Sequence, residues 1–115
     1  MNMQKLFQQA QKVQAEMARV QEELGSKTVE ATAGGQAVKA VANGHQELVA
    51  LQIDPSAVDP DDVEMLQDLV LTAVNEALHK AKEMAEGELG RVAQKLGLPG
   101  VPGAGAPGGA GLAGF

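Results

Sequence analysis

Cysteine is absent from the 115-residue sequence, and its aromatic side chains are limited to two Phe. Without thiols the chain cannot form a disulfide, a Cys-based zinc site or a thiol nucleophile. So few aromatic rings leave almost nothing on which single-stranded bases could stack. No apolar run approaches the roughly 20 residues of a membrane span, and the Gln-rich start does not resemble a signal peptide. These absences predict a cytoplasmic protein that binds neither a membrane nor single strands.

Basic residues are the minority charge, with 9 Lys and Arg against 15 Asp and Glu and a net charge of −6. Proteins that bind nucleic acids usually carry a patch or an excess of basic residues, so this acidic balance argues against that class of protein. The charge is unevenly placed, however, because residues 1–24 and 25–53 are each neutral. Residues 54–96 carry the whole excess of acid, so local cationic surfaces elsewhere remain available for an anionic partner.

The end of the chain lacks charge altogether. Residues 97–115 hold eight Gly and three Pro and no charged side chain. Gly and Pro at this density lose much chain entropy on ordering and offer little to bury. We expect a folded domain over residues 1–96, followed by a disordered tail over residues 97–115.

A helix is predicted over residues 3–24, which contain neither Gly nor Pro and consist mainly of good helix formers. Its apolar residues are separated by alternating steps of three and four, the spacing of a heptad repeat. We call this row the seam: Met3, Leu6, Ala10, Val13, Met17, Val20 and Leu24. So narrow an apolar row is typical of a helix that packs against another helix. The predicted dimer contacts are Leu6, Val13, Met17 and Val20.

Three cations, Lys5, Lys12 and Arg19, lie seven residues apart on one flank of the seam. The same pattern places the acids Glu16, Glu22 and Glu23 on the far side of the helix. The cationic row has two interpretations. It is either a solvated flank that pairs with a partner helix, or a surface that follows the phosphates of a nucleic acid.

Alternating apolar residues predict three short strands over residues 27–33, 37–42 and 47–53. Gly34-Gly35 separates the first two, and Asn43-Gly44, which favours a tight type I′ turn, separates the last two. The resulting antiparallel meander has an apolar face, including Val49, Leu51 and Ile53, which the helices must cover.

A second helix is predicted from Pro60 to Glu86, with Asp59 as its N-cap. Gly87 and Gly90 leave its continuation to Leu96 open. Capping accounts for the local acids better than a metal site does: Asp59, Asp61, Asp62 and Glu64. The apolar face of this helix is wider than a sheet of this size needs. Together with the seam, it predicts a homodimer.

No catalytic constellation is visible in the sequence. Nucleophilic catalysis needs a nucleophile, a base and a third group that orients the base. The sequence offers no such combination among its few candidates, which are Ser26, Ser56, His45 and His79. We expect neither an enzyme nor a cofactor.

The sequence resembles the YbaB/EbfC family of bacterial nucleoid-associated proteins over about residues 3–100. The specific part of the resemblance is the stretch from Ile53-Asp54-Pro55 through Asp59-Pro60-Asp61-Asp62 to Asn75-Glu76-Ala77. Weaker support comes from Asn43-Gly44 and from Leu96-Gly97-Leu98-Pro99-Gly100. The resemblance implies a small homodimer that binds DNA with protruding helices in a tweezer-like grip, and that compacts it or affects gene expression.

Together these features predict an α+β homodimer of the cytoplasm and nucleoid that binds double-stranded DNA with little sequence preference. No element is suited to reading base edges, so the expected contacts are to phosphates. The candidate DNA-binding residues are Lys5, Lys12, Arg19, Lys80, Lys82, Arg91 and Lys95. The alternative is a protein-interaction module that docks on a replication or recombination factor. Binding to naked DNA that weakens steeply with salt separates the two.

Overall fold

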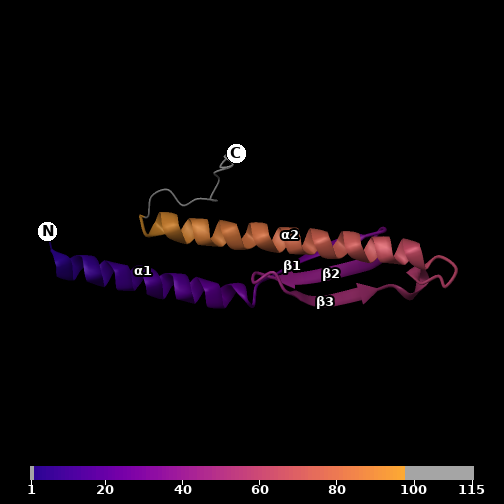
Figure 1. Ribbon diagram of the computed structural model, residues 1–115, viewed down its shortest axis with the longest axis horizontal. Coiled ribbons are helices and arrows are strands. Elements are labelled where there is room, and N and C mark those ends of the chain that lie inside the picture. Colours follow the sequence, from indigo (N-terminus) through magenta and orange to yellow (C-terminus); the bar gives the residue numbers. More distant parts are fainter. Residues whose placement is uncertain (1, 98–115) are drawn as a thin grey trace. The chain divides into compact units, whose positions relative to one another are not determined.

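The structure is a computed structural model that describes residues 2–97 (Figure 1). The predicted order of helix, three strands and helix is confirmed. The elements are α1 (Met3–Leu24), β1 (Thr28–Ala33), β2 (Val38–Asn43), β3 (Leu48–Ile53), a short 3-10 turn η1 (Pro55–Ala57) and α2 (Val63–Lys95). The predicted disordered tail lies outside the described residues beyond Gly97, so its disorder stays a prediction. No helix within residues 2–97 is long and apolar enough to cross a membrane.

The chain divides into two compact units. Within the described residues, the helical unit comprises residues 2–23 and 85–97, and the sheet unit comprises Leu24–Met84. Helix α2 contributes residues to both units.

The sheet unit contains an antiparallel sheet in the order β1-β2-β3. Ala31 pairs with Ala40, and Ala40 pairs in turn with Leu51. The register between β2 and β3 shifts at Val41/Ala42, which marks a bulge. Between β1 and β2, Gly34 and Gly35 both adopt φ of 65°, which glycine tolerates without steric cost.

The connection after Asn43 is longer than the predicted two-residue turn. The hairpin is confirmed, but its positive φ belongs to Gln46, and the Asn43 side chain accepts bonds from the backbone N–H groups of His45 and Glu47. Gly44 is needed for a different reason. Its N–H donates to the Leu24 carbonyl at 2.8 Å, and an added Cβ would lie 2.6 Å from that oxygen. The close approach of two backbones, rather than turn geometry, requires glycine here.

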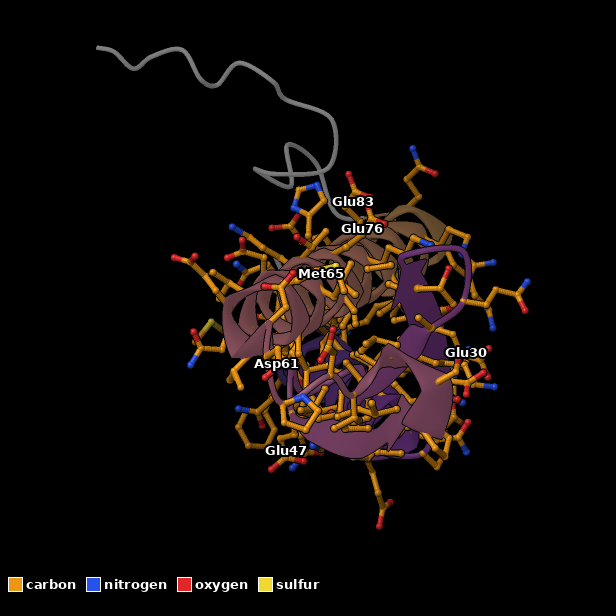
Figure 2. The ribbon with its side chains drawn as sticks, turned by 90° about the vertical axis from the view of Figure 1, so that its right-hand side faces the viewer. Glu30, Glu47, Asp61, Met65, Glu76 and Glu83 are labelled. Atoms are coloured by element: carbon orange, nitrogen blue, oxygen red, sulfur yellow. The ribbon has the colours of Figure 1, made fainter. Side chains whose placement is uncertain are left out.

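The core of the sheet unit is built mainly from alanine. The buried layer between α2 and the sheet consists of Ala31, Val38, Ala40, Ala42, Ala73, Ala77 and Ala81. These small side chains let the helix approach the sheet closely, and Figure 2 shows Glu76 and Glu83 on the opposite side of α2. The expected covering of the apolar sheet face is incomplete, because α2 packs on β1 and β2 but leaves β3 open. Val49, Leu51 and Ile53 remain 51%, 41% and 37% exposed.

The predicted start of the second helix is wrong by three residues, and its continuation beyond Glu86, which the sequence left open, is present. Asp62 rather than Asp59 is the N-cap, because its carboxylate accepts the Met65 backbone N–H at 3.2 Å. Asp59 instead closes the preceding turn by accepting from Asp61. The helix continues through both glycines to Lys95, where Gly97 at φ 75° ends it. Burial of Val92 and Ala93 in the last turns offsets the roughly 1 kcal/mol that each glycine costs a helix.

Candidate nucleic-acid interface

Three of the predicted DNA-binding residues line a single hollow in the helical unit. Lys5 and Lys12 of α1 lie there with Lys95 from the end of α2, around an open volume of about 350 Å³. Its remaining lining consists of Gln8, Gln9, Val13 and Leu96. The hollow therefore combines three ammonium groups with two amides that donate hydrogen bonds, and it contains no carboxylate.

Lys5 and Lys12 differ from the other cations of the helical unit in their lack of charged partners. In the part of the chain that the structure describes, neither ammonium group takes part in an ion pair or a side-chain hydrogen bond. They are seven residues apart, which places them two helical turns from each other on the same flank of α1. Lys95 is only loosely held, because its Nζ lies 4.0 Å from Glu16 Oε2 and its side chain is 71% exposed.

Arg19, the third cation of the predicted row, is already occupied. Its Nε and Nη1 lie 2.7 Å from Glu16 Oε1 and Glu23 Oε2, and its Nη2 lies 3.2 Å from Glu16 Oε2. These bonds raise the pKa of Arg19 further and lower that of Glu16. The prediction that the two acids lie on the far side of the helix is wrong, since spacings of three and four residues bring them beside Arg19.

The remaining candidates are not gathered in the hollow. Arg91 pairs with Glu88 in the last part of α2. Lys80 belongs to the sheet unit, where its Nζ donates to the Glu30 carbonyl at 3.1 Å. Lys82 also belongs to the sheet unit and has no ion pair among the described residues. The seven predicted cations are therefore divided between the two units.

The sheet unit has a hollow of its own, of about 540 Å³, on the polar face of the sheet. Its charged lining is mixed, with Glu30 and Asp54 beside Lys39. Lys39 Nζ lies 3.9 Å from Glu30 Oε1, so its charge is partly compensated. An anionic partner gains less here than at the hollow of the helical unit. Within residues 2–97 no group of three or more His, Asp or Glu side chains is arranged around a metal position.

The predicted dimer contacts differ widely in exposure. Leu6 is 51% exposed, Val13 and Met17 are partly buried, and Val20 is 4% exposed within the single chain. Leu6, Ala10 and Val13, with Gln9, line a largely apolar hollow of about 450 Å³. The N-terminal part of the seam is thus the part still open to a partner.

Sequence reasoning did not single out Gln8 or Gln9, and it placed Glu16 on the wrong side of α1. Gln8 and Gln9 could have been found from their position between Lys5 and Lys12, one helical turn from each. Glu16 could have been found from its place three residues before Arg19. Its approach to Lys95 has no signal in the sequence, because the two residues belong to different helices.

A model of the YbaB/EbfC DNA-binding family matches residues 1–96. A nucleoid-associated protein from Pelotomaculum thermopropionicum is 58% identical over 100 residues, which cover 87% of this chain and 95% of that protein. A nucleoid-associated protein from Moorella thermoacetica is 61% identical over 99 residues, covering 86% and 95%. The crystal structure of an uncharacterized protein, HP0035, from Helicobacter pylori superposes with a TM-score of 0.66 at 26% identity, covering 76% of this chain and 91% of that one.

Proposed function

The chain belongs to the YbaB/EbfC DNA-binding family, and we propose that it binds duplex DNA of the bacterial nucleoid through phosphates, with little base preference and without catalysis. The observation that carries the proposal is the hollow shared by Lys5, Lys12 and Lys95. Lys5 and Lys12 form no ion pair among the described residues, so their charge is available to phosphate.

The chemistry of this hollow favours phosphates over base edges. Ammonium groups on flexible stems act as point charges and carry little geometric specificity. Phosphate contacts of this kind position a protein on the duplex without reading its sequence. Gln8 and Gln9 add amide donors that suit phosphate oxygens equally well. Binding of this type alters the conformation or compaction of DNA when many copies are bound.

The active species is a homodimer in this proposal. A single copy leaves Val49, Leu51 and Ile53 exposed on β3, beside the alanine layer. Burying such side chains stabilises association by about 25 cal/mol for each Å² removed from water. A second copy that covers this face, and the open part of the seam at Leu6 and Val13, gives the complex two hollows. Two linked sites hold DNA far more tightly than one.

The second candidate function is a protein-interaction module that docks on a replication or recombination factor. The specific observation that favours it is the apolar hollow lined by Leu6, Ala10 and Val13 on α1, which a partner helix would fill. In that case the lysines pair with acids of the partner protein, and affinity for naked DNA is incidental.

Titration of a labelled duplex over a range of salt concentrations tests the proposal. Log affinity should fall with log salt by roughly 0.9 for each neutralised phosphate, hence by about 5 for six lysines in a dimer. The triple variant Lys5→Gln, Lys12→Gln, Lys95→Gln should bind every duplex more weakly and flatten this slope by several units.

The matched control is Lys39→Gln, Lys80→Gln, Lys82→Gln, which makes the same change in net charge within the sheet unit. It should leave the slope nearly unchanged. If the control has the larger effect, the DNA site lies in the sheet unit instead. If wild-type protein does not bind naked DNA at low salt, the protein-interaction function is favoured.

A further inference from the structure

One carboxylate stands among the cations of the proposed DNA-binding unit. Glu16 accepts two hydrogen bonds from Arg19, at 2.7 and 3.2 Å. The same side chain lies 4.0 Å from Lys95 Nζ, so it engages cations from both helices of the unit. Its pKa is lowered, first by the Arg19 hydrogen bond and then by the charges of Arg19, Lys95 and Lys12.

We propose that Glu16 is an internal competitor of DNA phosphate, which withholds Arg19 from the duplex and thereby limits affinity. This inference rests on the proposed DNA-binding function. It assigns to Glu16 the role of an affinity-determining residue that does not itself contact DNA.

The competition follows from the geometry of the guanidinium group. Carboxylate and phosphate are recognised by the same planar fork of N–H donors. Glu16 takes Nε and Nη2 of Arg19, and Glu23 takes Nη1, so a phosphate that approaches this fork meets occupied donors. Lys95 is engaged at the limit of ion-pair distance and is shared more readily.

The balance between the two anions is close enough to matter. Exposed ion pairs contribute little to stability because water screens them and because ordering two long side chains costs entropy. The Arg19 side chain is 49% exposed and the Glu16 side chain is 22% exposed, so water still reaches and partly screens their pair. An array of phosphates can therefore displace Glu16 in part, and removing its charge releases the rest of the Arg19 fork.

The test compares Glu16→Gln with Glu22→Gln. Both substitutions remove one negative charge from the same helix, but Glu22 is exposed and has no ion pair among the described residues. Any long-range effect of net charge is therefore shared by the two variants. We expect Glu16→Gln to bind duplex DNA several-fold more tightly than Glu22→Gln at equal salt. Its slope of log affinity against log salt should be steeper by about one to two units for a dimer, one Arg19 from each chain.

A second pair of variants locates the effect. In an Arg19→Gln background, Glu16→Gln should gain much less affinity, because the main cation that it releases is gone. Should Glu16→Gln unfold the helical unit, as seen in its thermal transition, Glu23→Gln replaces it, since this change frees Nη1 of the same guanidinium.

Three results overturn the inference. Equal affinities of Glu16→Gln and Glu22→Gln exclude local competition. A weaker Glu16→Gln shows that the carboxylate positions the cations for DNA instead of withholding them. An undiminished gain in the Arg19→Gln background removes Arg19 from the mechanism. Failure of the proposed function looks different, because then neither the wild type nor any variant binds with a salt-dependent affinity.

Discussion

The helical unit and the sheet unit differ most in their charge. The helical unit contains five cations and five acids and is neutral, whereas the sheet unit contains four cations and ten acids and carries the whole net charge of −6. An average over the chain, such as the pI near 4.8, hides this difference. The comparison teaches that an acidic protein can present a DNA-binding surface if its acids are collected elsewhere. In the proposed binding mode the acidic unit repels DNA and restricts contact to the neutral one.

The two units also differ in what they leave uncovered. The sheet unit exposes an apolar strand face, whereas the helical unit exposes the open part of the seam and, beside it, Lys5 and Lys12, which form no ion pair in the described part of the chain. We therefore expect dimerisation and DNA contact to be separable by mutation. The predictions below test that separation.

The largest effect is expected from Leu51→Glu on β3. A charge placed at the centre of the proposed dimer face costs several kcal/mol when buried without a partner, so the dimer should dissociate more than about 100-fold more readily. Light scattering measures the change in mass, and circular dichroism checks that the protomer stays folded. DNA affinity should fall because a monomer offers one hollow to DNA instead of two. The slope of log affinity against log salt should be roughly halved.

The matched control for Leu51→Glu is Gln52→Glu, which adds the same charge to the next residue of the same strand, on the opposite face. Because β-strand side chains alternate between faces, this control should leave the dimer intact. A dimer that survives Leu51→Glu would contradict the assignment of β3 to the interface.

Gly44→Ala should have the next largest effect, on stability. The added Cβ would lie 2.6 Å from the Leu24 carbonyl oxygen and 2.8 Å from Leu24 Cβ, so the backbone must move. Overpacking of this kind costs about 1–3 kcal/mol, and each kcal/mol lowers Tm by about 4–8 °C in a domain of this size. Thermal unfolding measures the change. An unchanged Tm would show that the end of α1 is free to shift away from the turn.

Gly87→Ala should act in the opposite direction and more weakly. Gly87 lies inside α2, and an added Cβ meets nothing within 4 Å. Replacing a helical glycine by alanine stabilises a helix by up to about 1 kcal/mol. The same thermal unfolding experiment should show a higher Tm with unchanged DNA affinity. A lower Tm would indicate that the glycine serves a contact that appears only in the dimer.

The smallest effect is expected from Asp54→Asn in the sheet unit. The backbone N–H and the hydroxyl of Ser56 lie 2.9 Å from Asp54 Oδ1 and lower the pKa of this carboxylate. A group whose pKa is lowered by folding contributes stability above its unfolded pKa, and this contribution is lost as the pH falls through the folded pKa. The variant should have a Tm lower by about 2 °C at most at neutral pH. The difference should vanish in acid, below the folded pKa; a difference that persists there would assign it to packing.

Much of the fold could be predicted from local pattern. The seam of α1 and the alternation in the three strands are short-range signals, and each placed its element within a residue or two. The ends of α2 could not be predicted in the same way. Asp59 and Asp62 are both good caps by residue type, and only the geometry of the turn after η1 selects Asp62. Helix continuation past Gly87 depends on burial of Val92 and Ala93, a tertiary effect.

The candidate site was predictable as a set of cations but not as an arrangement. Heptad spacing placed Lys5 and Lys12 on one flank, yet nothing in the sequence brings Lys95 to the same hollow. Arg19 belongs to the same row by spacing, but Glu16 and Glu23 occupy it. Side-chain geometry decides which anion binds Arg19, and a count of charges in the sequence does not reveal that geometry.

The alanine layer between α2 and the sheet limits how this protein can change. Its members are already so small that almost nothing can be removed from them, and every substitution except that to glycine adds atoms to a layer in which Ala40, Ala73 and Ala77 are fully buried. Most cores tolerate both shrinkage, which leaves a cavity, and modest growth with repacking. Here the constraint is one-sided. Variation that preserves the fold must accumulate on the outer faces and at the helix ends, where the charges proposed to contact DNA are also found.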